Sequence, residues 1–330
     1  MSGSQLTDSH HRRLNYLRVS VTDRCNFRCI YCTPAEKVPR LAHDDILRYE
    51  EIYRILRVGM SLGINKVRVT GGEPLVRQGI GKFLERLARM EGLSDVSLTT
   101  NGLRLSGFLD TLRAAGIRRL NISLDTLRPD RFKAITGVDA FETVWNAIQG
   151  AHKHGFAPIK INAVAMRGIN DDELEEIASL SFTHPFHIRF IEYMPIGTLR
   201  FKTDPYISTD EIRRRVGGIG QLIPVEHSPG DGPAERYRFP GAKGEIGFIS
   251  PISHHFCGTC NRLRLTASGG LRACLLSDKE TDLKTLIRAG GSDASIRRVF
   301  EEVARAKPER HGISAACHLG PQSRMSAIGG

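Results

Sequence analysis

The stretch KVRVT at residues 66–70 decides the fold class, because Val67 and Val69 alternate with Arg68 and Thr70. A period of two residues is that of a β-strand, which presents successive side chains to opposite faces of a sheet. The same alternation marks candidate strands at residues 17–21, 95–99, 119–124 and 159–164. With a sixth candidate strand at residues 187–193, the sequence predicts six strands, of which five have one apolar and one polar face.

Amphipathic runs that are typical of helices separate these strands, at residues 45–62, 81–90, 107–115 and 141–154. Gly63, Gly116 and Gly155 follow three of these runs and provide helix-ending positions. Strands and helices that alternate in this way predict a parallel sheet, either open or curled.

The polar strand faces favour the curled form. Parallel sheets are normally covered on both faces, and their strands then read as nearly continuous apolar runs. A sheet with one solvated face is the alternative, but buried Arg and Lys side chains need anionic partners, which a ligand inside a barrel supplies. Six units are two fewer than a closed eight-unit barrel contains. We therefore expect an α/β fold, an incomplete six-unit (β/α) TIM-like barrel over residues 1–205.

The pattern changes after Tyr206. A helical segment at 208–216 precedes short candidate strands at 221–225, 235–239, 245–249, 263–266 and 271–274. Two helical segments follow at 282–289 and 293–306, and then a tail rich in small residues. We expect residues 206–330 to form a C-terminal region of short strands and helices that closes the open side of the barrel.

The composition is that of a globular protein. The chain has 330 residues, 40% of them hydrophobic, and 47 Lys and Arg against 36 Asp and Glu give a net charge of +11. This excess favours an acidic partner such as a nucleotide, a nucleic acid or an anionic lipid. No apolar run reaches the length of a membrane helix, and residues 1–20 lack the apolar core of a signal peptide. We expect a cytoplasmic protein without membrane contact.

Cys25, Cys29 and Cys32 form a C-x3-C-x2-C pattern directly after the first strand, where parallel barrels build their active sites. Three thiolates can hold three corners of an iron–sulfur cube and leave the fourth iron open, whereas electron-transfer clusters normally have four cysteines. A zinc site completed by a distant His or Cys is the alternative.

Cys257, Cys260 and Cys274 form a second triad with the pattern C-x2-C-x13-C. A hairpin of the strands at 263–266 and 271–274 would return Cys274 to the other two. Zinc is a stronger alternative here, because C-x2-C pairs are common zinc ligands and His254, His255 or Cys317 would supply a fourth. Cys317 otherwise reads as a plain buried thiol.

The first triad, together with Gly71-Gly72-Glu73-Pro74 after the second strand, resembles the radical S-adenosylmethionine superfamily. This resemblance implies a [4Fe–4S] cluster whose open iron chelates the amino and carboxylate groups of S-adenosylmethionine. One electron from the cluster then cleaves the sulfonium bond and yields a 5′-deoxyadenosyl radical.

Both triads together resemble the GTP 3′,8-cyclases of molybdenum cofactor biosynthesis. The resemblance covers nearly the whole chain, through LRVSVTDRCNFRCIYC, RVTGGEPLVR, TTNG, NISLDT, KINAV, EYMPIG, FCGTCNRLRLT and the terminal Gly-Gly. It implies a second [4Fe–4S] cluster on the second triad, whose open iron holds guanine. The radical would abstract hydrogen from the 3′ carbon of GTP, which attacks carbon 8 to give (8S)-3′,8-cyclo-7,8-dihydroguanosine 5′-triphosphate. This lyase reaction is the first step of the pathway.

The resemblance also implies ligands for individual residues. It assigns S-adenosylmethionine to Tyr31, Gly72, Ser123 and Met194, with Glu73 and Asn101 as weaker candidates. It assigns GTP to Arg18, Arg68, Thr99, Lys160, Arg262 and Arg264. The alternation already places four of the GTP residues and Ser123 on the polar face. Arg262 and Arg264 point the same way at a period of two, although a solvated edge strand would show the same pattern.

Gly329 and Gly330 end the chain, and such a pair usually forms a frayed tail. Two residues without Cβ can also bring backbone groups against a ligand. The resemblance implies that the tail enters the active site, where we expect a catalytic role in cyclisation.

The expected partners are GTP, S-adenosylmethionine and a reducing electron donor. The sequence is also compatible with a homodimer. Another radical enzyme with an auxiliary cluster, acting on peptide or RNA, is the nearest alternative. With one Trp and seven Tyr, the sequence shows no stacking platform for nucleic acid. A zinc-stabilised nucleic-acid-binding protein would leave the GGEP motif and the polar strand faces unexplained.

Overall fold

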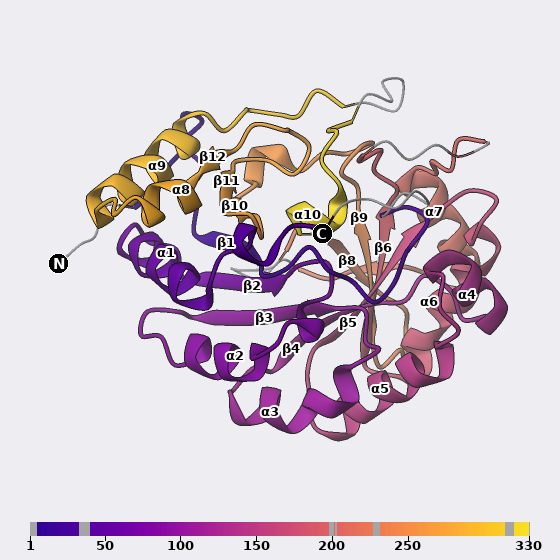
Figure 1. Ribbon diagram of the computed structural model, residues 1–330. Helices are drawn as coiled ribbons and strands as arrows, with labels where there is room; N and C mark the ends of the chain where they lie inside the picture. The colour runs from indigo at the N-terminus through magenta and orange to yellow at the C-terminus, as the bar shows by residue number, and fades with distance from the viewer. Residues whose placement is uncertain are drawn as a thin grey trace.

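The computed structural model describes residues 5–32, 40–197, 201, 203–226, 232–313 and 320–329. Six parallel strands lie side by side in chain order (Figure 1). They are β1 (Tyr16–Ser20), β2 (Lys66–Thr70), β3 (Asp95–Thr100), β4 (Arg119–Ser123), β5 (Ile159–Ala165) and β6 (Phe186–Glu192). The predicted α/β class with a mostly parallel sheet is therefore confirmed.

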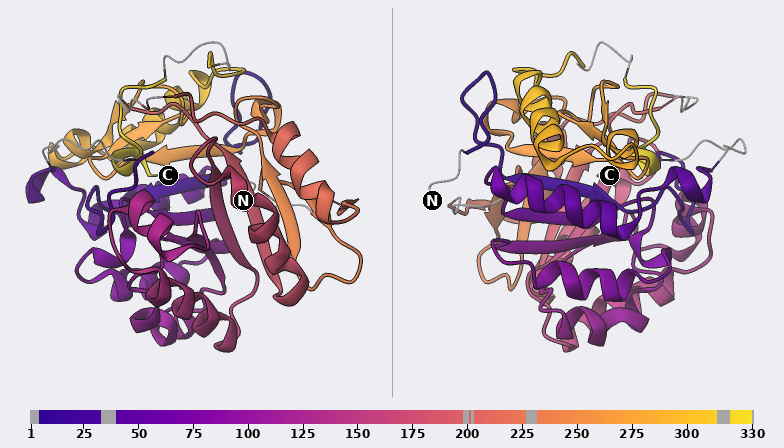
Figure 2. Two further views of the ribbon diagram at one scale, coloured as in Figure 1. Left: turned by 90° about the vertical axis from the view of Figure 1, so that its right-hand side faces the viewer. Right: turned by 60° about the vertical axis from the view of Figure 1, so that its left-hand side comes forward.

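Helices connect these strands and cover the outer side of a curved sheet (Figure 2). They are α1 (Tyr49–Ser61), α2 (Ile80–Ala88), α3 (Leu109–Ala114), α4 (Pro129–Thr136), α5 (Phe141–Lys153) and α6 (Leu174–Thr183). The first helix begins four residues later than predicted, because His43–Asp45 forms a separate 3₁₀ turn and Arg48 is extended. Further 3₁₀ turns lie at Pro74–Val76, Leu105–Phe108, Asp171–Glu173, Gly217–Ile219 and Cys257–Thr259.

The C-terminal strands extend both edges of this sheet. Strand β9 (Glu245–Ile249) pairs in parallel with β6, and β10 (Arg262–Leu265) pairs in parallel with β1. Antiparallel strands follow at each edge: β8 (Glu235–Arg238) and β7 (Ile223–Pro224) beyond β9, and β11 (Gly270–Arg272) and β12 (Thr281–Asp282) beyond β10. Because β10 lies between β1 and β11, Arg262 and Arg264 do not belong to a solvated edge strand.

The remaining helices are α7 (Thr209–Val216), α8 (Leu283–Arg288), α9 (Asp293–Arg305) and the short α10 (Met325–Ile328). Helix α10 lies close to the middle of the molecule beside the strands in Figure 1.

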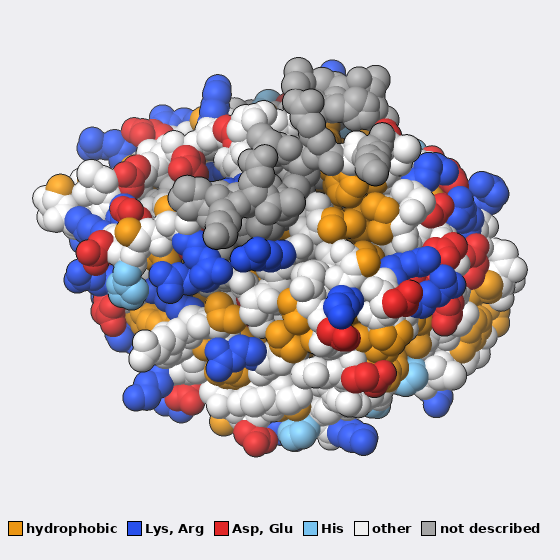
Figure 3. Space-filling model, turned by 45° about the vertical axis from the view of Figure 1, so that its right-hand side comes forward, with side chains coloured by type: hydrophobic (Ala, Val, Ile, Leu, Met, Phe, Trp, Pro, Cys, Tyr) orange, Lys and Arg blue, Asp and Glu red, His pale blue; other side chains and the backbone are white. Residues whose placement is uncertain are grey.

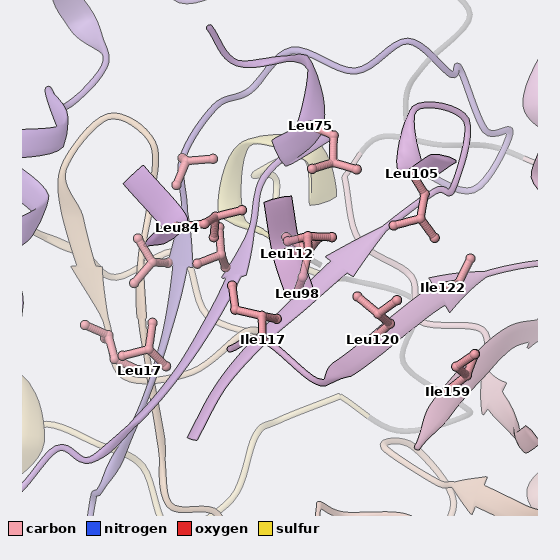
Figure 4. Close-up of a cluster of buried hydrophobic side chains, with 14 of the residues drawn as sticks. Leu17, Leu75, Leu84, Leu98, Leu105, Leu112, Ile117, Leu120, Ile122 and Ile159 are labelled. Carbon is pink, nitrogen blue, oxygen red and sulfur yellow. The ribbon is translucent and has the colours of Figure 1, made fainter. Parts of the chain in front are cut away.

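The apolar phase of the strands forms the core against the helices. Leu98, Leu120 and Ile122 have no exposed surface, and Figure 4 shows them among Leu84 and Leu112 of the covering helices. Burying one such side chain contributes about 1.5 to 3 kcal/mol, so this face fixes the register of each strand. The polar side chains, which alternate with the apolar ones along each strand, therefore face the inner side of the curved sheet.

Among the described residues, no helix is long and apolar enough to cross a membrane. On the face shown in Figure 3, Lys and Arg side chains are mixed with Asp and Glu side chains rather than gathered in one continuous patch. Much of the positive charge on this face is therefore an ordinary solvated surface.

Candidate active site

A cavity of about 750 Å³ follows the polar inner face of the sheet. Its volume lies within the range of ligand-binding pockets, toward the large end. All six cysteines of the two triads line it. So do the other predicted site residues that the structure describes, apart from Gly329: Tyr31, Gly72, Glu73, Ser123, Met194, Arg18, Arg68, Thr99, Lys160, Arg262 and Arg264. The fold thus brings together residues that are up to about 250 positions apart in the sequence.

The first triad lies in the loop after β1, and the GGEP motif holds this loop by its backbone. The Gly72 amide donates to the Thr22 carbonyl at 2.6 Å, and the Glu73 amide donates to the Arg24 carbonyl at 2.8 Å. A Cβ on Gly72 would lie 2.3 Å from the Arg24 carbonyl oxygen, so only glycine permits this approach. The glycine therefore positions the cysteine loop in addition to leaving the cavity open beside it.

Glu73 is buried at the end of the same motif. Its carboxylate accepts hydrogen bonds from the Thr100 hydroxyl at 2.8 Å and from the Asn101 amide at 2.7 Å. Burial raises the pKa of Glu73 to about 7. The Asn101 side chain in turn donates to Asn26 Oδ1 at 2.8 Å, next to Cys25. The weaker candidate Asn101 thus links the GGEP motif to the first triad.

Asp125 is a second buried carboxylate at the cavity, and sequence reasoning missed it. It accepts hydrogen bonds from the Tyr31 hydroxyl and from the Val164 amide, both at 2.8 Å. Burial raises the pKa of Asp125 to about 6. Its position directly after β4, two residues beyond Ser123, was the available signal, because strand ends carry the site in this fold class.

The surroundings of the first triad are apolar and acidic. Burial raises the pKa of the Cys25 thiol, and the nearby Glu73 carboxylate adds to the rise. Burial likewise raises the pKa of Cys29 well above its usual value, with Cys32 and Asp125 adding to the effect. Metal binding at this triad must therefore displace tightly held protons.

Three arginines on neighbouring strands form a row across the cavity wall. Arg18 of β1 is opposite Arg264 of β10 on one side and Arg68 of β2 on the other. Burial and the neighbouring Arg68 and Arg262 charges lower the pKa of Arg18 to about 10, although Tyr16 opposes this shift. Arg18 Nε and the Tyr16 hydroxyl are buried without a hydrogen-bond partner among the described residues. Such a row needs an anion.

Lys160 and Thr99 continue the polar face on β5 and β3, where both are opposite Asn121 of β4. Lys160 is buried, and so is Arg189 of β6, which lines the same cavity. Sequence reasoning missed Arg189. Its place in the polar phase of the candidate strand at 187–193 was the signal that would have found it.

The second triad lies where β10 and β11 meet the 3₁₀ turn Cys257–Thr259. Strand β11 ends at Arg272, so Cys274 lies two residues beyond the strand rather than at its end. Burial acts to raise the pKa of the Cys260 thiol, but the positive charges of Arg262 and Lys307 prevail and lower it to about 6. This triad is thus surrounded by cations.

Each triad supplies three cysteine sulfurs, and Cys317, which the sequence offered as a further zinc ligand, lies outside the described residues. Within the described ranges, no three His, Cys, Asp or Glu side chains are grouped closely enough to hold one metal ion. A structural zinc ion needs four ligands around a single centre, whereas a cluster binds each cysteine to a different iron. Three cysteines at each end of the cavity match a cluster with one open iron.

Gly329 packs beside this cavity, and Gly330 lies outside the described residues. Gly329 is buried with a φ of +75°, and a Cβ on it would lie 2.8 Å from Thr70 Cγ2 and 3.1 Å from Ser20 Cβ. Its carbonyl accepts a hydrogen bond from the Arg264 guanidinium. The tail is also held by the Gly197 amide, which donates to the Pro321 carbonyl at 2.7 Å. Gly329 is therefore packed against the strand ends of β1 and β2.

Comparison with known families agrees with this geometry. Residues 19–181 match the Radical SAM superfamily, and residues 186–313 match the family Molybdenum Cofactor Synthesis C. The chain is 49% identical to a GTP 3′,8-cyclase of Thermodesulfovibrio yellowstonii, over 98% of this chain and 100% of the relative. It is 47% identical to a GTP 3′,8-cyclase of Geobacter sulfurreducens, over 99% of this chain and 100% of that protein.

Solved structures show a similar fold at low sequence identity. Streptococcus suis SuiB is 16% identical, with a TM-score of 0.60 over 86% of this chain and 67% of SuiB. SuiB bound to S-adenosylmethionine gives a TM-score of 0.59 at 15% identity, over 94% of this chain and 79% of SuiB. These likenesses concern the fold alone. From the two matched family regions and the full-length relatives, the chain belongs to the GTP 3′,8-cyclase family of the radical S-adenosylmethionine superfamily.

Proposed function

We propose that this chain converts GTP to (8S)-3′,8-cyclo-7,8-dihydroguanosine 5′-triphosphate, the first step of molybdenum cofactor biosynthesis. One observation carries the proposal: two triads of cysteine ligands and a row of three arginines line the same cavity. A binding module has no need for a second metal centre beside its anion site. Family membership supplies the reaction.

The first triad forms the half of the cavity that binds S-adenosylmethionine. A [4Fe–4S] cluster on Cys25, Cys29 and Cys32, with S-adenosylmethionine bound, would supply the one-electron cleavage that yields a hydrogen-abstracting radical. The backbone at Gly72 and the carboxylate of Glu73, which line the cavity, would receive the methionine ammonium group. Asp125 fixes the Tyr31 ring through its hydroxyl at 2.8 Å. Ser123 and Met194 line the same half.

The row of arginines forms the half of the cavity that binds GTP. A triphosphate carries about four negative charges near neutral pH, by extension from phosphate titration. Arg18, Arg68 and Arg264 line the cavity from the adjacent strands β1, β2 and β10, and Lys160 lines it from β5. Arg262 lies at the start of β10 beside the second triad. Arg264 and Lys160 are each at least 95% buried, so their charges are costly without an anion. Thr99 adds a hydroxyl to the same wall.

A second [4Fe–4S] cluster on Cys257, Cys260 and Cys274 would hold the guanine ring at its open iron. Support comes from the three-cysteine donor set and from the position of this triad on the same cavity as the arginines. The chain would then bind GTP at two points, its phosphates on the arginines and its base at the second triad. Binding at two points fixes the ribose between them, which is the orientation that hydrogen abstraction needs.

Gly329 would bring the tail against this arrangement. Its carbonyl takes one hydrogen bond from Arg264, a residue of the GTP half. Through this contact the tail would assist cyclisation. Gly330, the next residue of the tail, lies outside the described residues.

The finer architecture belongs to the same proposal. We take β1 to β6 with their helices as an incomplete six-unit barrel over residues 1–205, and residues 206–330 as the region that closes its open side. The pairing of β9 and β10 with the two edges of that sheet supports this division. Reduction of the first cluster needs an electron donor. The cytoplasmic location and a homodimer stay predictions.

Anaerobic incubation with GTP, S-adenosylmethionine and a chemical reductant tests the function. We expect 5′-deoxyadenosine and the cyclised nucleotide together, identified by liquid chromatography and mass spectrometry. Chain with Cys25→Ala is the matched control and should form neither product. Formation of 5′-deoxyadenosine without any GTP-derived product would refute GTP as the substrate and favour a peptide or RNA.

A further inference from the structure

Lys307 is a buried lysine behind the second triad, two residues beyond the end of α9. Its ammonium group donates to the Arg262 carbonyl at 2.9 Å and to the Ala273 carbonyl at 2.6 Å. Arg262 is two residues after Cys260, and Ala273 is directly before Cys274. One side chain therefore ties together the two backbone segments that carry these cysteines.

Arg12 does the same for the third cysteine. Its guanidinium donates to the Cys257 carbonyl at 2.7 Å and to the Pro308 and Glu309 carbonyls at 2.6 and 3.0 Å. Arg12 and Lys307 thus donate hydrogen bonds to backbone carbonyls within two residues of every cysteine of the second triad. We call Arg12 and Lys307 the basic brace.

The two cations of the basic brace differ in how their charge is balanced. Arg12 is paired with the buried Asp8 carboxylate at 2.6 Å. Lys307 has no ion pair with a carboxylate in the part of the chain that the structure describes, and it is only 4% exposed. A buried ammonium group needs a nearby anion. Burial lowers the pKa of Lys307, and the nearby sulfurs of Cys260 and Cys274 oppose this shift.

The first triad has the opposite surroundings. Beyond the effect of burial, the Glu73 carboxylate raises the pKa of Cys25, and the Asp125 carboxylate raises that of Cys29. The net charge near an iron–sulfur cluster is one of the factors that set its reduction potential. A fixed positive charge favours the added electron, and it acts strongly where water is excluded.

We propose that Lys307 is a positioning residue of the second cluster that raises its reduction potential, because it places a buried positive charge beside two of the cluster's thiolate ligands. The inference rests on the proposed second cluster. It predicts that the potential of the second cluster depends on the charge at position 307 rather than on the sulfur ligands alone.

The test uses the full-length chain with Cys25→Ala, Cys29→Ala and Cys32→Ala, in which any remaining cluster is the second one. Reconstituted protein is titrated with reductant anaerobically, and the reduced cluster is followed by electron paramagnetic resonance. Lys307→Met removes the charge and keeps much of the side-chain length, whereas Lys307→Arg keeps the charge. Lys82→Met on the exposed face of α2 is the control.

We expect a lower midpoint potential in Lys307→Met than in the parent, a potential near the parent's in Lys307→Arg, and no change in Lys82→Met. Loss of iron in Lys307→Met but not in Lys307→Arg would also support the role of the charge. An unchanged potential at full iron content in Lys307→Met, or equal loss of iron in both variants, would overturn the inference. Absence of iron and sulfide from the parent itself would instead refute the proposed second cluster.

Discussion

The two cysteine triads line one cavity, yet the charges around them are opposite. The first lies beside the buried carboxylates Glu73 and Asp125, and the second beside the buried Lys307 and the half-buried Arg262. The spacing of the cysteines shows little of this, because Glu73, Asp125 and Lys307 come from segments distant from these cysteines in the sequence. Two similar sets of cysteine ligands thus have different electrostatic surroundings in this fold. We propose that the two triads also have different roles in the reaction.

Removing each triad should have the largest effect and should separate their roles. Replacing Cys25, Cys29 and Cys32 with Ala should halve the iron and sulfide content and abolish 5′-deoxyadenosine formation. Replacing Cys257, Cys260 and Cys274 with Ala should also halve the iron but leave some cleavage of S-adenosylmethionine. Metal analysis and chromatography measure both results.

These two triple variants serve as controls for each other, because each keeps the other triad. If the variant of the second triad loses zinc in place of iron, the proposal of two clusters is wrong.

Deleting Gly329 and Gly330 should suppress the cyclised product and leave iron content and S-adenosylmethionine cleavage largely intact. The single change Gly329→Ala should act in the same direction, because its Cβ would lie 2.8 Å from Thr70 Cγ2 at a φ of +75°. Gly218→Ala is a matched control, since a Cβ there meets nothing within 4 Å. A normal yield of product from the truncated chain would show that the tail has no part in the reaction.

Breaking the row of arginines should have a smaller effect. Arg18→Ala or Arg264→Ala should weaken GTP binding by about 1.5 to 3 kcal/mol, the scale of a charge-assisted hydrogen bond. That range corresponds to roughly 10- to 150-fold in the dissociation constant, measurable by calorimetry. Arg297→Ala, at a side chain that is 39% exposed, is the control. Equal weakening of GTP binding in the control would mean that binding depends only on the net charge of the protein.

The smallest expected effect is a difference in thiol reactivity in the metal-free chain. The pKa of Cys260 is lowered to about 6, whereas burial raises the pKa of Cys25 above its usual value of 9.0. A thiolate is the reactive form, so at pH 7.5 Cys260 should be alkylated by iodoacetamide before Cys25. Peptide mass spectrometry over a range of pH measures this order. The reverse order would contradict the assigned charges around the triads.

The sequence predicted the parts of the site that repeat or cluster. The period of two placed Arg18, Arg68 and Lys160 on the inner face, and the spacing of the cysteines identified both triads. These signals are local, because a strand alternates its side chains whatever lies beside it.

Contacts between segments that are distant in the sequence could not be predicted from the sequence. Arg12 and Lys307 read as ordinary surface cations, because only the folded chain shows that they contact the backbone of the second triad. Asp125 is a single carboxylate after a strand, with no pattern around it. The pairing of β9 and β10 with the edges of the sheet was missed for the same reason, since short strands do not specify their partners.

The central claim is that one cavity holds S-adenosylmethionine and GTP in contact, and isotope transfer tests it most directly. GTP carrying deuterium at the 3′ carbon is incubated anaerobically with the enzyme, S-adenosylmethionine and reductant, and the 5′-deoxyadenosine is analysed by mass spectrometry. We predict that deuterium from the 3′ carbon appears in 5′-deoxyadenosine and that the cyclised nucleotide accumulates with it. Unlabelled 5′-deoxyadenosine under the same conditions would contradict the claim that the radical forms next to the GTP ribose.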